Sequence, residues 1–169
     1  MKKITSFILL LIASYLAFSQ EMETNPNTKK INLPPGVDKS YLDKIEAGII
    51  DPAAPIDVNL ICIDFFNNLI LGNISNAYKE LLKGSPILNN EKKLKMQLEK
   101  TEEAIKLYGK ILGFESVGAE YLANSYVTVK FITLHNFNPL LWTLSFYKSP
   151  NLGWIVMNLK LTDYIKTEE

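Results

Sequence analysis

This 169-residue chain has no arginine, and it has only one cysteine and one histidine. All 18 of its basic side chains are lysines, which alternate with acidic side chains along the chain. Arginine is the usual side chain for two-point binding of phosphate and guanine, and an electrostatic footprint needs basic residues gathered on one face. We therefore expect no nucleic-acid partner.

The scarcity of cysteine and histidine also limits the chemistry available. Cys62 cannot form an internal disulfide, and its apolar neighbours favour a small buried side chain over a reactive thiol. A transition-metal site needs several converging ligands, whereas Cys62 and His135 lie far apart in the sequence. The chain also has no glycine-rich phosphate loop and no nucleophile elbow. We expect neither a metal nor a cofactor.

Residues 1–20 have the three parts of a secretory signal. Two lysines are followed by an apolar run over residues 4–18, and small residues at positions 17 and 19 suit cleavage after Ser19 or Gln20. The run is shorter than the ~20 residues that a bilayer span needs, and no later stretch is apolar for long enough. We expect a secreted or periplasmic protein with no membrane span after signal removal. Its lysines would then number two fewer than the 18 acidic residues.

The remaining chain divides into a linker and one domain of ordinary size. Residues 21–36 are polar and proline-containing, which is typical of a disordered tether. A short helix is expected over 38–47, and the Asp-Pro-Ala-Ala-Pro segment ends this linker, which we place at 21–54. The compact domain is expected over 55–165.

Apolar spacing predicts three helices at the start of that domain. The first runs from Pro55 or Ile56 to Leu71, the second spans 75–83, and the third spans 90–112 with Gly113 as its cap. A single stripe marks the inner side of the third helix: Leu94, Leu98, Thr101, Ile105, Tyr108 and Leu112. Its glutamate–lysine pairs four residues apart indicate a solvated outer side.

Four segments that follow have the alternation of strands. They are Phe114–Tyr121, Tyr126–His135, Leu140–Lys148 and Trp154–Thr162. Apolar side chains alternate with polar ones most clearly in the last three, which predicts a sheet wet on one face and packed on the other. The predicted fold class is α+β, with three N-terminal helices packed on a curved antiparallel sheet of about four strands.

Several short motifs carry a family resemblance. They are Ala77–Leu82 followed by Ser85-Pro86, Tyr108-Gly109, and Phe146–Pro150 leading to Gly153-Trp154. In this order of elements they resemble small secreted bacterial members of the nuclear transport factor 2-like superfamily, the ketosteroid-isomerase cone with its cystatin-like fold. The resemblance covers about residues 55–163. It implies a pocket between sheet and helices that serves isomerase, dehydratase or cyclase chemistry, binds a ligand without catalysis, or is a filled core. A shared fold does not choose among these.

Two ionisable side chains are candidates for such a pocket. His135 shares strand parity with Val129 and Phe131, which suits a general base near the pocket mouth. The alternative is a histidine at a strand end that meets solvent or a backbone carbonyl. Asp64 would be an acid with a raised pKa if it were buried, and an ordinary wet carboxylate on the Asp57–Asn68 side of its helix otherwise.

The other candidates are aromatic. Tyr78 and Tyr108 are candidate donors to an oxyanion, or else residues at the core edge with wet hydroxyls. Trp142, Phe146 and Trp154 line a ligand cavity or fill the cone, and filling is the favoured alternative. Phe131 is a further candidate for the pocket lining.

Three functions remain open. The leading hypothesis is a secreted non-catalytic domain that binds a small apolar ligand, a peptide or a partner protein. The second is an isomerase- or dehydratase-type enzyme that uses Asp64 or His135 with Tyr78 or Tyr108. The third is a structural module that forms a homodimer through its open sheet face. A cavity with an ionisable group favours the enzyme, an empty apolar cavity favours the ligand-binding domain, and a filled interior favours interaction with a partner.

Overall fold

The computed structural model describes residues 40, 43–44 and 47–163. The chain divides into two units, 1–37 and 38–169, and every described residue belongs to the second. The expected signal segment, the polar tether and most of the expected short helix lie outside the described residues. Within the described part, no helix combines the length and the apolar character needed to cross a membrane.

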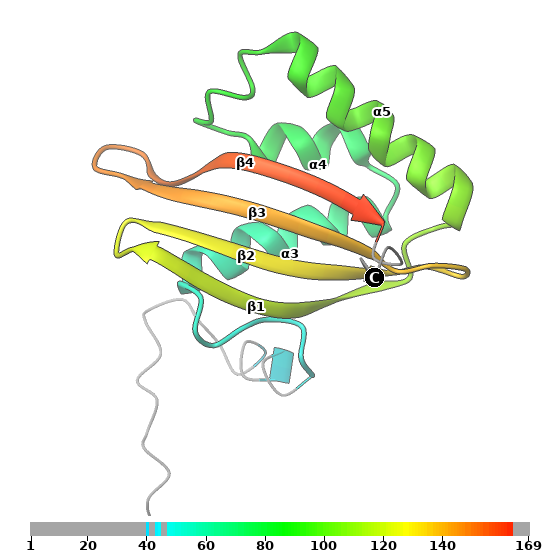
Figure 1. Ribbon diagram of the computed structural model, residues 1–169, viewed down its shortest axis with the longest axis horizontal. Coiled ribbons are helices and arrows are strands. Elements are labelled where there is room, and N and C mark those ends of the chain that lie inside the picture. The colour runs from blue at the N-terminus through cyan, green and yellow to red at the C-terminus, as the bar shows by residue number, and fades with distance from the viewer. Residues whose placement is uncertain (1–39, 41–42, 45–46, 164–169) are drawn as a thin grey trace, which may run out of the picture. The chain divides into compact units, whose positions relative to one another are not determined.

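The second unit has an α+β fold in which three helices precede a four-stranded antiparallel sheet (Figure 1). The helices are α3 (Ile56–Ile70), α4 (Ile74–Leu81) and α5 (Glu91–Tyr108), and the strands are β1 (Gly113–Ala123), β2 (Tyr126–Leu134), β3 (Leu140–Ser149) and β4 (Gly153–Asp163). Each strand pairs with its neighbour in sequence, so the spatial order is β1-β2-β3-β4. The expected α+β class, with three helices and four antiparallel strands, is confirmed.

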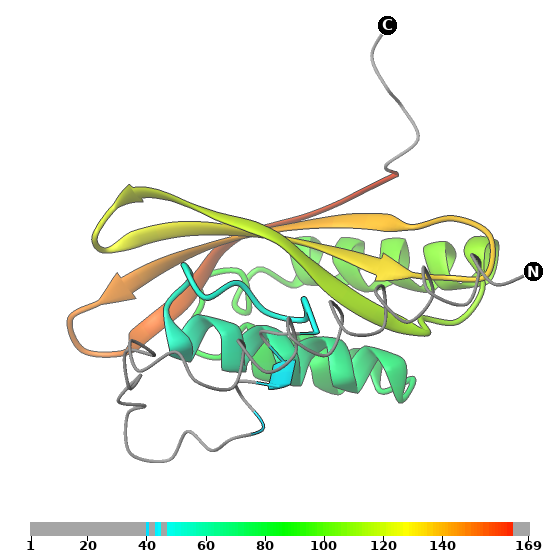
Figure 2. The same ribbon diagram turned by 90° about the horizontal axis from the view of Figure 1, so that it is seen from below.

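The helices lie on one side of the sheet (Figure 2). The side chains on that side are the apolar members of the alternating pattern, with Val129 opposite Leu144 and Phe131 opposite Trp142. Alternate residues of the same strands, such as Thr128 and Thr143, are half-buried on the other side. Period-two alternation therefore produced the two faces that it predicts.

Helix α3 lies against the middle of the sheet and supplies much of the core. Its side chains at Val58, Cys62 and Phe66 are fully buried, as expected for a helix that is apolar over a wide arc. The helix ends where Gly72 takes a positive φ of 79°, a conformation that glycine adopts without steric cost.

The predicted end of the third helix was wrong. Helix α5 ends at Tyr108, and its cap is Gly109 with φ 91° rather than Gly113. Residues 110–112 leave the helix because the Leu112 N–H already donates to the Leu134 carbonyl at 2.8 Å, at the start of the β1–β2 pairing. Leu112 is consequently 61% exposed, while Ile111 takes the buried position.

Candidate functional site

Aromatic rings occupy the space between the helices and the sheet. The Phe66 ring centroid lies 5.0 Å from that of Phe131, and the Phe65 centroid lies 5.5 Å from that of Trp142. Phe114 stacks on Phe66 with centroids 4.9 Å apart. Centroid separations of this size are those of rings in direct contact. The rings from α3 and from the sheet therefore interlock and fill this part of the interior.

Three of the aromatic pocket candidates belong to this filled interior. Phe131, Trp142 and Phe146 are all fully buried, with side chains on the helix-facing side of β2 and β3. Phe131 and Trp142 contact the α3 rings directly. They lie within the core of the described domain.

Tyr78 is buried and belongs to the same aromatic cluster. Its hydroxyl lies 2.7 Å from Thr101 Oγ1, and Thr101 Oγ1 itself donates to the Gln97 carbonyl at 2.9 Å. The single Thr101 proton is thus committed to Gln97, so Tyr78 must donate to Thr101. Burial raises the pKa of Tyr78, and the hydrogen bond between Tyr78 and Thr101 offsets only part of this rise. The hydrogen bond from the Tyr78 hydroxyl to Thr101 therefore links α4 to α5, and the hydroxyl proton is not directed at a substrate.

His135 lies just after β2 with both ring nitrogens bound to protein atoms. Its Nδ1 is 2.8 Å from the Gly109 carbonyl, which can only accept, so Nδ1 carries the proton. Its Nε2 is 3.1 Å from Thr133 Oγ1, which accepts from Trp142 Nε1 at 2.9 Å. The Thr133 proton is therefore directed at His135 Nε2. The three side chains form a continuous chain of hydrogen bonds from the core to the end of α5.

This chain of bonds gives His135 a structural position. A general base must reach a substrate proton with a free nitrogen lone pair, but the lone pair on Nε2 already accepts from Thr133. The histidine links β2 to the cap of α5 and shares the buried Thr133 hydroxyl with Trp142. No histidine, cysteine or carboxylate cluster capable of holding a metal occurs in the described part of the chain.

Asp64 does not join the interior. It lies on the exposed side of α3, because the neighbouring positions Cys62, Phe65 and Phe66 all turn inward. Its backbone carbonyl accepts a hydrogen bond from the Asn68 side chain at 2.9 Å. The helical period therefore separates this carboxylate from the buried aromatic rings and from Tyr78.

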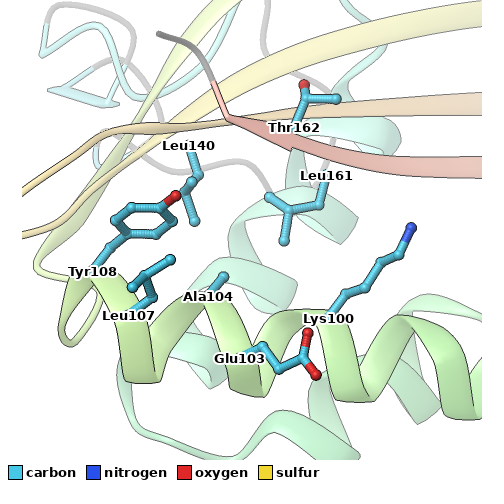
Figure 3. Close-up of a pocket in the computed structure, with 8 residues that line it drawn as sticks. All are labelled: Lys100, Glu103, Ala104, Leu107, Tyr108, Leu140, Leu161 and Thr162. Carbon is cyan, nitrogen blue, oxygen red and sulfur yellow. The ribbon is translucent and has the colours of Figure 1, made fainter. Parts of the chain in front are cut away.

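Tyr108 borders a surface groove rather than the interior. The groove has a volume of about 250 Å³ and lies between the second half of α5, the start of β3 and the end of β4. We name it the α5–β4 groove. Figure 3 shows its apolar walls, formed by Ala104 and Leu107 from α5 and by Leu140 and Leu161 from the sheet. Lys100, Glu103 and Thr162 complete its lining.

A second hollow of about 320 Å³ lies between residues 48–52 and β1. Its one carboxylate, Asp51, accepts from the Ala53 N–H at 2.7 Å. The Tyr121 hydroxyl donates to the Ala53 carbonyl at 3.1 Å, and its pKa is raised by burial and then by the Asp51 charge. These contacts tie the start of the domain to β1. They bring together no pair of groups suited to acid–base chemistry.

Sequence reasoning missed Thr101 and Thr133 as the partners of the two candidate side chains. It also missed the groove, because Leu107 falls outside the predicted apolar stripe of the third helix. Its position beside the stripe member Tyr108 was the available signal. Comparisons with protein-family models, with curated proteins and with solved structures found no match to this chain.

Proposed function

We propose that this protein is an exported, non-catalytic domain that recognises a peptide segment or a partner protein on its outer surface. The observation that carries the proposal is the aromatic filling of the interior, with Phe66 in contact with Phe114, Phe131 and Trp142. Rings in contact leave no space for a ligand at that place. Recognition is then assigned to the surface, where large apolar side chains are exposed at Leu107, Leu122 and Phe137.

An enzyme of the isomerase or dehydratase kind has less support. Such an enzyme needs an ionisable group facing a desolvated cavity. Tyr78 donates to Thr101, His135 is bound at both nitrogens, and Asp64 is exposed. The three groups lie on different elements and do not converge on one hollow.

We also infer that the fold is the cone of the nuclear transport factor 2-like superfamily. The support is the order of elements, three helices followed by a four-stranded antiparallel meander, together with the motifs quoted above. Within that superfamily, this chain would be a member in which a filled core takes the place of the pocket. Export rests on the tripartite pattern of residues 1–20.

The filled interior can be tested with benzene, which enters dry apolar cavities large enough to hold it. We expect saturating benzene to leave the NMR signals of the Phe66 ring and the Trp142 indole unchanged. Shifts of both signals, with a saturable titration curve, would instead show an interior cavity and restore the small-ligand hypothesis.

Recognition at the surface can be tested by photo-crosslinking in the organism that makes the protein. A benzophenone side chain is placed in turn at Leu107, Leu122 and Phe137, and the full-length protein is expressed. We expect a discrete crosslinked product from at least one position, and the exported chain should begin at Gln20 or Glu21. No product from any position would contradict a surface-recognition function.

A further inference from the structure

Strand β4 is an edge of the sheet, and two of its outward carbonyls are bonded to side chains. In the described domain, the Ser85 hydroxyl donates to the Val156 carbonyl, and the Gln97 side-chain amide donates to the Leu159 carbonyl at 3.3 Å. Ser85 lies in the connection between α4 and α5, and Gln97 lies in α5, which runs beside β4 (Figure 1). Exposed edges invite pairing with other chains, and these two side chains occupy the outward carbonyls of Val156 and Leu159.

The last part of the same edge is open. The Leu159 carbonyl points away from β3, and the backbone groups of alternate residues in a strand point to the same side. The N–H and carbonyl of Leu161 must therefore also point outward. Among the described residues, none forms a hydrogen bond with these outward groups. The open site coincides with the α5–β4 groove, which Leu161 lines.

The groove beside this open edge has the chemistry of a side-chain pocket. Leu107 is 67% exposed on the last turn of α5, and it faces the groove together with Ala104, Leu140 and Leu161 (Figure 3). A volume of about 250 Å³ holds one large apolar side chain and part of its backbone. An apolar hollow next to unpaired strand groups is the combination used by proteins that bind peptides through strand addition.

The charge at the groove favours an acidic ligand group. In Figure 3, Lys100 extends from α5 toward β4 on the side of Leu161 away from Tyr108, whereas Glu103 lies along the helix. Lys100 has no ion-pair partner among the described residues. A carboxylate close to the ligand's apolar residue would supply one.

We propose that the α5–β4 groove binds an extended peptide segment from a partner protein. The segment adds to β4 through the backbone groups of Leu161, inserts one large apolar side chain beside Leu107, and places a carboxylate near Lys100. This inference rests on the proposed function and names the class of partner for it.

The test begins with a display library of random eight-residue peptides selected on the purified full-length protein. We expect enriched sequences to combine a large apolar residue with a nearby acidic residue or a C-terminal carboxylate. The affinity of one enriched peptide is then measured by fluorescence anisotropy. Leu107→Gln should weaken binding by at least tenfold, and Lys100→Ala should weaken it several-fold, with the larger effect at low salt.

A matched control separates the groove from general surface stickiness. Leu152 is 62% exposed, nearly as much as Leu107, but lies outside the groove lining, in the turn before β4. Leu152→Gln should leave the affinity within about twofold. Hydrogen exchange supplies a backbone readout, because peptide binding should slow exchange of the Leu161 amide while the Thr143 amide of the central strand β3 is unchanged.

Several outcomes would overturn the groove proposal. One is equal binding by the wild-type protein and Leu107→Gln, and another is an unprotected Leu161 amide in the complex. A failure to enrich any peptide would also do so. A dimer that Leu107→Gln dissociates would assign the groove to a second copy. Peptide binding that appears only after residues 164–169 are removed would assign it to the chain's own C-terminus.

Crosslinking keeps the two proposals distinguishable. Products from Leu122 or Phe137 without products from Leu107 would retain surface recognition and reject the groove. An absence of products from all three positions would reject both proposals.

Discussion

Replacing Thr133 by valine tests the hydrogen-bond chain that joins the core to the end of α5. Valine keeps the branched shape and removes the hydroxyl that binds both Trp142 Nε1 and His135 Nε2. Thr133 and Trp142 are fully buried, so water cannot replace the lost acceptor at the indole N–H. His135 is half-buried, and its Nε2 can turn to solvent. The cost should therefore arise mainly at Trp142.

The magnitude follows from the orphaned indole donor. A buried polar group left without a partner costs about 1–3 kcal/mol, whereas removing both partners together is far less costly. We expect Thr133→Val to lower the free energy of unfolding by about 1–3 kcal/mol. Trp142→Phe removes the donor but also leaves a cavity, so its own cost is larger. The double variant has no indole N–H left without an acceptor. Its loss of unfolding free energy should therefore be smaller than the sum of the two single losses by about 1 kcal/mol or more.

The assay is urea unfolding followed by circular dichroism for the two single variants and the double variant. Thr143→Val is the matched control, since Thr143 lies half-buried on the opposite face of the sheet, and its effect should stay within about 0.5 kcal/mol. Nitrogen NMR of His135 provides an independent readout, because Thr133→Val should weaken the preference for the Nδ1–H tautomer. Strict additivity of the two core substitutions, with an unchanged tautomer, would refute the reasoning.

The other predictions concern the core and one turn. Phe66→Ala should cost about 3–5 kcal/mol of unfolding free energy in the same urea assay, because its fully buried ring contacts both α3 and the sheet; a cost below 1 kcal/mol would mean a loose interior. Burial raises the pKa of the Cys62 thiol, so its contribution to stability is present below the ordinary thiol pKa of about 8.5 and declines at higher pH, by up to about 1.4 kcal/mol per pH unit; Cys62→Ala should flatten that decline. Gly109→Ala should destabilise more than Gly72→Ala, since both have positive φ but only the Cβ at Gly109 would meet Asn136, at 3.3 Å; equal midpoints would contradict this.

Local pattern in the sequence was enough to predict the elements of the domain. The alternation of Val127, Val129 and Phe131 required a strand with one buried face, and the structure has it. The wide apolar arc of residues 56–70 predicted a largely enclosed helix, and seven of its residues are buried. These predictions succeed because a residue's neighbours at two, three and four positions along the chain determine which face it shares.

The same local reasoning misplaced the end of the third helix. Leu112 continues the helical period, so its spacing alone gave no reason to stop. The helix stops because Gly109 takes a positive φ and Leu112 pairs with Leu134, a residue 22 positions later. The competing contact belongs to the sheet, and its register does not appear in the helical pattern.

Among the functional candidates, the sequence by itself determined which side chains exist and which element carries each of them. Only the tertiary structure decided what they meet. The Tyr78 hydroxyl meets Thr101, 23 residues away, and His135 meets the Gly109 carbonyl, 26 residues away. The α5–β4 groove likewise exists only because α5 lies beside the last strand. Helical and strand periods are local properties of the chain, whereas hydrogen bonds between elements depend on strand register and on how the helical layer lies against the sheet.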